Sequence, residues 1–210
     1  MRGSQVTASL LLTSFEQYRN CIINSISFMR DHFICTDTLD IFVGHLRPIR
    51  VPRKTILIKP LVKDNNVYMI ERGIARSFNL INGKEMTSWF SQEGELIYST
   101  NSFYGTTEGY ENERVQVLED SLLYYIPIPE LKELCFRHIE ISNWLRLLHQ
   151  KAFVEMERRL IYRLYMSAEE RYKDLYQKDA GIFQRVNLSY IASYLGISPV
   201  TLWKLRKDIK

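Results

Sequence analysis

The segment from 141 to 166 constrains the fold most, because no glycine or proline interrupts its 26 residues. At a rise of about 1.5 Å per residue, one helix over this segment would be about 39 Å long. Its apolar residues occupy more than one face, so several sides of the helix must be covered. Leu147, Val154 and Ile161 recur every seven residues. We predict a homodimer that pairs along this helix through these three residues; the alternative is the core helix of a monomer.

The segment from about Arg47 to Ile126 is typical of a β domain, with many β-branched and aromatic residues between turn signals. Asn82-Gly83 fits the type I′ turn of a hairpin, in which both central residues need positive φ. So many short strands favour a small jelly roll or barrel. Before them, from Ser14 to about His32, apolar residues at helical spacing predict a helix.

The last 24 residues, NLSYIASYLGISPVTLWKLRKDIK, predict two short helices joined by a sharp turn. Asn187 can cap the first helix and Gly196 can end it in the left-handed conformation. Ser198-Pro199 is typical of the start of the second helix. Apolar residues at the inward positions complete a helix-turn-helix pattern. They are Ile191, Ala192, Leu195, Ile197, Leu202 and Leu205.

The outward side of this pattern predicts contact with double-stranded DNA. The residues that we expect to contact it are Asn187, Ser189, Ser198, Val200, Thr201, Trp203, Lys204 and Lys207. Lysines can bind phosphates or guanine acceptors, and valine can touch a thymine methyl group. The two helix N-termini can donate backbone N–H groups to phosphates. The net charge of +4 allows such a partner; the alternative is a basic terminal cap with a solvated face.

Ser167 and Glu170 have the spacing of a capping box, which predicts that the long helix ends near Met166. We therefore divide the chain into an effector domain at 1–140, a dimerisation helix at 141–166 and a helix-turn-helix domain at 167–210. The predicted class is α+β, with N-terminal helices and an antiparallel β-roll before the long helix.

Other classes of protein lack support in the sequence. No apolar run reaches the ~18–20 residues of a membrane span, and the N-terminal ASLLL is too short for a signal-peptide core, so we expect a cytoplasmic chain without a membrane partner. Cys21, Cys35 and Cys135 are far apart, and the histidines have no metal-binding spacing, so we predict no metal and no cofactor. An enzyme on a β-roll, such as a cupin, would need a histidine pair or a nucleophile with its base, so we predict no enzyme.

With this order of elements, the chain resembles the catabolite-activator and fumarate–nitrate regulator (CRP/FNR) family. The resemblance is carried by VYMIERGIARSF, NGKEMTSWFSQEGEL, MSAEERYKDL and RVNLSYIASYLGISPVTLWKLRK. AEERY and YIASYLGISPVTL are similar to a short branch of the family known from Bacteroides-type bacteria. The resemblance implies a homodimeric transcription regulator on a pseudo-palindromic operator, with one recognition helix in each major groove. It also implies RNA polymerase as a partner.

Members of the family that bind cyclic nucleotides use a Gly-Glu-Leu segment and, farther on, an Arg-Ser pair that holds the phosphate. Gly94-Glu95-Leu96 matches the first, but Glu111-Asn112 stands where the pair is expected. The segment from 92 to 120 has seven carboxylates and one arginine, a net charge of −6, which opposes a phosphate. We therefore predict no response to cyclic AMP, unless a shifted alignment makes Arg114 the phosphate ligand. For a small-molecule effector of unknown identity, the expected pocket residues are Gly94, Glu95, Tyr98, Tyr110 and Asn112.

Further departures concern sensing and DNA contact. The cysteine cluster of the oxygen-sensing members and a haem-ligand pattern are missing. The family usually has a charged residue where Val200 stands and arginine where Lys204 stands, and because the sequence ends at Lys210 we expect no wing hairpin. Thr201 and Lys204 are, by position, the strongest candidates for DNA contact. Val200 and Trp203 motivate the alternative of a sensor or interaction module whose helix-turn-helix contacts protein.

Overall fold

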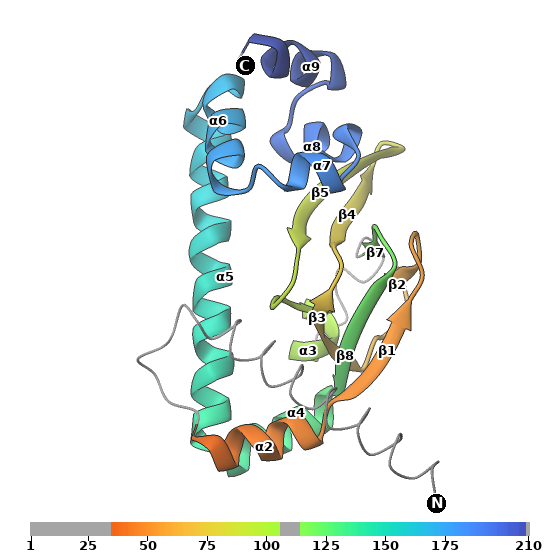
Figure 1. Cartoon of the computed structure of the whole chain (residues 1–210), viewed down its shortest axis with the longest axis vertical. Helices are drawn as coiled ribbons and strands as arrows, with labels where there is room; N and C mark the ends of the chain where they lie inside the picture. The colour runs from red at the N-terminus through yellow and green to blue at the C-terminus, as the bar shows by residue number, and fades with distance from the viewer. Residues whose placement is uncertain (1–34, 106–113, 209–210) are drawn as a thin grey trace, which may run out of the picture.

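The computed structural model describes residues 35–105 and 114–208 (Figure 1). The helix expected between Ser14 and His32 lies outside these ranges, as do Tyr110, Glu111 and Asn112. A β-roll lies beside one long helix, and a group of short C-terminal helices lies at the far end of that helix (Figure 1). The expected α+β class is confirmed.

The β-roll consists of two four-stranded antiparallel sheets, with strand orders β1-β8-β3-β6 and β2-β7-β4-β5. The strands are β1 Arg47–Val51, β2 Ile56–Ile58, β3 Asn66–Arg72, β4 Ala75–Ile81, β5 Lys84–Ser91, β6 Leu96–Tyr98, β7 Arg114–Val117 and β8 Ser121–Pro127. Ile70 and Leu123 from the first sheet pack with Val115 from the second in one buried cluster. The expected jelly-roll arrangement therefore has its core between two sheets.

Two glycine turns connect the strands in different ways. Asn82 and Gly83 have φ of 50° and 74°, which confirms the predicted hairpin turn between β4 and β5. Gly73 has φ of 132°, and a Cβ atom there would lie 1.9 Å from the Oγ atom of Ser121. The strands on either side of Gly73 belong to different sheets, so this turn crosses between the sheets and does not close a hairpin.

The helices are α2 Thr36–Gly44, α3 Thr100–Tyr104, α4 Ile128–Arg137, α5 Ile139–Tyr165, α6 Ala168–Lys178, α7 Ile182–Arg185, α8 Leu188–Leu195 and α9 Pro199–Asp208. Helix α5 has 27 residues and begins two residues before the expected start. Its first turns bury Ile141, Trp144 and Leu145 against α2 and α4, and the Trp144 ring lies 5.0 Å from the ring of Phe42. The rest of α5 extends away from this core toward the C-terminal helices (Figure 1).

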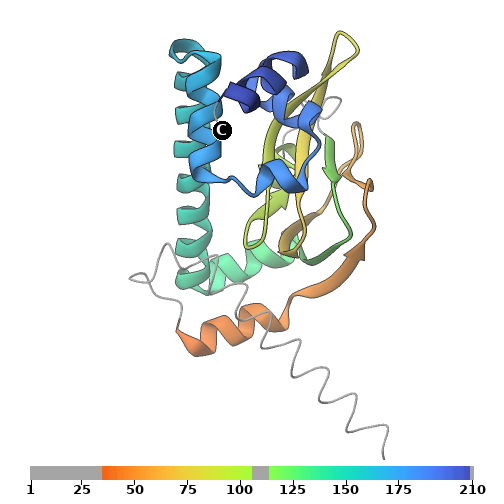
Figure 2. The same ribbon diagram turned by 45° about the horizontal axis from the view of Figure 1, so that its top comes forward.

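The C-terminal helices begin with the predicted capping box. The Ser167 hydroxyl accepts from the backbone N–H of Glu170, and the Glu170 carboxylate accepts from the backbone N–H of Ser167. Their own apolar core includes Tyr172, Ile191 and Leu202, and Ile74 of the β-roll is part of the same cluster. The helix-turn-helix therefore packs directly against the β-roll (Figure 2).

Within residues 35–105 and 114–208, no helix is both long enough and apolar enough to span a membrane.

Candidate functional site

The helix-turn-helix is formed by α8 and α9, and its ends have the predicted local chemistry. The Asn187 side chain accepts from the N–H of Ser189 at 2.9 Å, and the Ser198 hydroxyl accepts from the N–H of Thr201 at 3.0 Å. Gly196 has φ of 68°, in the left-handed region. These contacts confirm both predicted caps and the predicted turn.

The inward positions of the motif form its core. Ile191, Ala192, Leu195 and Leu202 are buried, and Ile197 and Leu205 are partly buried against them. Side chains from both helices therefore hold α9 at a set angle to α8, as the sequence predicts.

The outward side of α9 presents an exposed face. Val200 and Trp203 are 64% and 60% exposed, and Lys204 and Lys207 are also exposed. The Lys207 ammonium lies 5.7 Å from the centroid of the Trp203 ring. Thr201 is half-buried, and its hydroxyl lies 2.8 Å from that of Ser198. The Thr201 and Ser198 hydroxyl groups thus already contact each other at the start of α9.

The remaining candidates lie at the starts of the two helices. Asn187, Ser189 and Ser198 are exposed, and the Ser189 hydroxyl donates to the Asn187 side chain at 2.9 Å. Their backbone N–H groups lie at helix N-termini, where partial positive charge favours an anion.

Helix α8 is attached to strand β5, which is the edge strand of its sheet. The Ser193 hydroxyl accepts from the N–H of Thr87 at 2.8 Å and donates to the carbonyl oxygen of Glu85 at 2.9 Å. The Phe90 and Tyr194 rings meet beside this point at 5.2 Å. The Ser193 hydroxyl therefore binds the edge strand of the β-roll both as a hydrogen-bond acceptor and as a donor.

A buried arginine reinforces this contact. Arg76 of β4 is 1% exposed, and its guanidinium contacts the rings of Phe78 and Tyr190, at 4.2 and 3.4 Å from their centroids. It pairs with the Glu85 carboxylate at 2.5 Å and donates to the side chain of Gln116. Tyr190 belongs to α8, so a cation of the β-roll is enclosed by the first helix of the motif.

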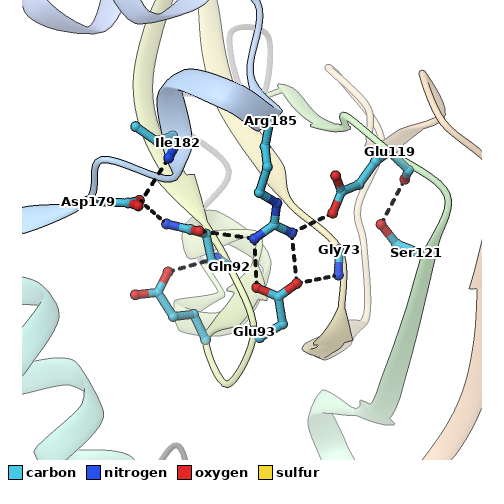
Figure 3. Close-up of polar contacts among 9 residues, drawn as sticks. Gly73, Gln92, Glu93, Glu119, Ser121, Asp179, Ile182 and Arg185 are labelled. Carbon is cyan, nitrogen blue, oxygen red and sulfur yellow. Dashed lines mark hydrogen bonds and ion pairs between the residues drawn. The ribbon is translucent and has the colours of Figure 1, made fainter. Parts of the chain in front are cut away.

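A second arginine also joins the C-terminal helices to the β-roll, but here the arginine belongs to the C-terminal helices and its acceptors to the β-roll (Figure 3). Arg185 of α7 makes two hydrogen bonds to Glu93, at 3.0 and 2.7 Å, and one to Glu119. The N–H of Gly73 also donates to Glu93, at 2.9 Å. Burial disfavours the charged form of Glu93, but the hydrogen bonds from Arg185 and Gly73 outweigh it, so the pKa of Glu93 is lowered. Both acceptors lie in the acidic segment between 92 and 120.

Gln92 extends this network to the loop before α7 (Figure 3). Its Nε2 atom donates to Asp179 at 2.5 Å, and Asp179 also accepts from the N–H of Ile182 at 3.1 Å. Sequence reasoning missed Arg76, Arg185 and this network. The sequence signal for this network is the charge of −6 in the segment from 92 to 120, because so many carboxylates need cationic partners.

The structure separates the residues expected in an effector pocket. Gly94 has φ of 81° in the turn between β5 and β6, and the next residue, Glu95, lines a cleft between this turn, α5 and the helix-turn-helix domain. Tyr98 does not line that cleft. Its ring contacts those of Phe103 and His149, at 5.2 and 5.5 Å, and burial raises the pKa of Tyr98 to about 12.

The residues expected in the dimer seam also differ in their surroundings. Leu147 is partly buried against the core of the β-roll and α4. Val154 and Ile161 are 57% and 47% exposed. They belong to a larger exposed set on the second half of α5, which comprises Phe153, Val154, Met156, Leu160, Ile161, Leu164 and Tyr165. An apolar surface of this extent is typical of a face that a partner covers.

No family model matches the chain, and no curated protein matches it. Solved structures do match it. FixK2 from Bradyrhizobium japonicum has a TM-score of 0.65 at 13% identity, over 78% of this chain and 84% of that one. A protein of Eubacterium rectale assigned to the CRP/FNR family of transcriptional regulators has a TM-score of 0.64 at 14% identity, over 83% of each chain. The chain has the fold of these regulators.

A third similar structure is that of CLP from Xanthomonas campestris, a global regulator responsive to cyclic di-GMP. Its TM-score is 0.62 at 15% identity, over 83% of this chain and 91% of that one. The match therefore spans most of both chains. The similarity to the short Bacteroides-type branch stays a prediction.

Proposed function

We propose that the chain is a dimeric, DNA-binding transcription regulator of the CRP/FNR family that does not respond to cyclic AMP. The observation that carries the proposal is the helix-turn-helix itself. Both of its caps are present, its core is packed, and its second helix presents a continuous exposed face with two lysines. The role is one of binding and not of catalysis.

The proposed DNA contact uses the exposed face of α9. Val200, Lys204 and Lys207 are spaced at i, i+4 and i+7, which places them along one side of the helix. Lys204 can reach base acceptors in the major groove, while Lys207 is one turn farther along, where a phosphate is the expected ligand. The backbone N–H groups at Asn187 and Ser198 supply further phosphate contacts.

The proposed dimer uses the exposed apolar surface of α5. A second copy related by a two-fold axis would cover Val154 and Ile161 with the same residues of its own helix. Two recognition helices would then face successive turns of the major groove of a pseudo-palindromic operator. In this arrangement residues 1–140 form the effector domain, 141–166 the dimerisation helix and 167–210 the DNA-binding domain, and RNA polymerase is the partner that the role implies.

Selection of bound sequences from a random DNA pool tests this function. The full-length chain should enrich a pseudo-palindrome, and its affinity should fall steeply between 50 and 200 mM salt, roughly as expected for several phosphate contacts. If no duplex sequence is enriched at low salt, the function is wrong. The exposed Val200 and Trp203 would then favour the second candidate, a module whose helix-turn-helix contacts protein.

A further inference from the structure

A cleft lies where the three parts of the molecule meet. Its walls are the β5–β6 turn with Glu95, the second half of α5, and helices α6 and α8. Its volume is about 430 Å³, within the range of about 300–1,000 Å³ that small-molecule sites occupy. The part of the chain that is proposed to bind DNA therefore forms one wall of a cavity large enough for a metabolite.

Basic side chains outnumber acidic ones around this cleft, six to four. Of the acidic residues, Glu155 pairs with Arg158 at 2.6 Å, and Asp174 pairs with Lys178. Asp179 accepts the two hydrogen bonds described above, and burial raises the pKa of Glu95, which favours its neutral form. Three of the four acidic side chains thus already have partners, and burial favours the neutral form of the fourth, Glu95.

The positions of two of these arginines are explained by hydrogen bonds within the protein. Arg163 donates to the carbonyl oxygen of Tyr194 at 3.0 Å, and Arg171 donates to that of Leu195 at 3.0 Å. These carbonyl groups end helix α8, where cations are stabilising. They account for the position of these two side chains without any ligand.

Arg159 has no such explanation. It is half-buried and its guanidinium lies 4.4 Å from the centroid of the Tyr194 ring, yet it forms no hydrogen bond or ion pair with any residue in the described ranges. The Nε atom of the adjacent Arg158 is buried without an acceptor, whereas no nitrogen of Arg159 is. A guanidinium has five N–H donors, and those of Arg159 stay accessible to a ligand in the cleft. The cleft therefore has a surplus of charged donors.

We propose that this cleft binds a small molecule that carries a diphosphate, whose oxygens accept from the guanidinium of Arg159. The planar fork of arginine matches phosphate oxygens in pairs, which a lysine cannot do. A diphosphate supplies the two or more negative charges that the surplus requires, whereas a cyclic nucleotide supplies one. This cleft shares Glu95 with the expected effector pocket but does not include Tyr98, and the proposal rests on the proposed function only in treating the ligand as an effector.

The position of the cleft indicates what the ligand would do. Because α6 and α8 form part of the wall, the ligand contacts the helix-turn-helix domain, the β-roll and α5 at once. It therefore binds more tightly when the helix-turn-helix domain is docked on the β-roll, as in this structure, than when this domain has moved away from it. The ligand therefore shifts the population toward the docked arrangement by its difference in affinity for the two.

Calorimetric titration of the full-length chain tests the site without DNA, with inorganic pyrophosphate and adenosine diphosphate as probes. Wild type should bind at least one probe saturably, and Arg159→Ala should bind it about tenfold or more weakly. Arg146→Ala removes an exposed arginine of the same helix outside the cleft and should bind as wild type does. Arg159→Lys keeps the charge and should retain part of the affinity, which provides a second comparison if the alanine variant does not fold.

Three results overturn the proposal. One is the absence of saturable binding of either probe at millimolar concentration, and another is unchanged binding by both Arg159 variants. The third is a loss of operator affinity by Arg159→Ala in the absence of probe, because DNA phosphates would then be the ligand of this arginine. Failure of the DNA selection leaves the calorimetric result intact, so the site and the proposed function fail independently.

Discussion

The guanidinium of Arg76 lies 3.4 Å from the centroid of the Tyr190 ring, and this contact joins the β-roll to the first helix of the helix-turn-helix. The Phe78 ring also contacts the cation, with its centroid at 4.2 Å, and Glu85 supplies the counter-charge. Together with Arg185 and Ser193 it adds polar contacts to an attachment that also contains the apolar cluster around Ile74. Interfaces between domains of one chain commonly combine polar and apolar contacts in this way.

The Arg76–Tyr190 contact should be measurable as a coupling free energy. In a double-mutant cycle with Arg76→Met and Tyr190→Ala, followed by urea unfolding, we expect a coupling of about 1–2 kcal/mol, since the cation is desolvated. Tyr190→Phe keeps the ring and should unfold close to wild type. Additive effects of the two substitutions would contradict the prediction.

The ion pair between Arg185 and Glu93 should make stability depend on pH. The pKa of Glu93 in the folded chain lies below its ordinary value of 4.5, so the pair contributes fully above about pH 4.5 and loses its contribution as pH falls through the folded pKa. The difference in the free energy of unfolding between wild type and Glu93→Gln should therefore be largest near neutral pH and shrink on acidification. Glu133→Gln, on the exposed side of α4, controls for the loss of a surface carboxylate. A difference that stays constant from pH 7 to pH 3 would rule out this role.

Two lysines of α9 should have different effects on DNA binding. Lys204→Ala should cost on the order of 1–3 kcal/mol and relax the preference at one base pair of each half-site. Lys207→Ala should weaken all sequences alike and lower the salt slope by about one for each half-site. Titrations on selected and scrambled DNA at two salt concentrations separate the two effects. Lys173→Ala, an exposed lysine of α6 that pairs with Glu169, should bind as wild type does; if neither α9 variant differs from it, α9 is not the recognition helix.

The exposed face of α5 should hold the dimer together. In light scattering, wild type should have about twice the chain mass of 24.9 kDa, and the double variant Val154→Glu, Ile161→Glu should have the mass of one chain. Charges on a face that a second copy covers would be left without water. Val62→Glu changes a comparably exposed valine in the β-roll and should remain dimeric. Wild type that stays monomeric at micromolar concentration while binding DNA would exclude this interface.

Cyclic AMP should not bind tightly to the β-roll, because Glu111-Asn112 stands where the family resemblance places the phosphate ligands. Calorimetry with cyclic AMP should show no saturable heat in the micromolar range. If binding is found, Arg114→Ala distinguishes a shifted alignment, which would abolish the binding, from a site elsewhere.

The local features of the fold could be predicted from the sequence because each depends on a few adjacent residues. The hairpin at Asn82-Gly83, the capping box at Ser167, and the caps and left-handed glycine of the helix-turn-helix all form within a span of a few residues. The long uninterrupted helix is local in the same sense. Helical periodicity then separated buried from exposed positions in the helix-turn-helix, where Ile191 and Leu202 are buried as expected.

The contacts between distant segments were decided by the tertiary structure alone. The strands on either side of Gly73 are adjacent in sequence but belong to different sheets. Leu147 and Val154 have equivalent positions in the seven-residue repeat, yet one packs against the core and the other is exposed. Arg185 finds its carboxylate partners across the domain boundary, and Arg76 contacts the Tyr190 ring across it. The charge pattern of one segment shows that a carboxylate or an arginine needs a partner, but only the path of the backbone determines which residue comes within hydrogen-bonding distance.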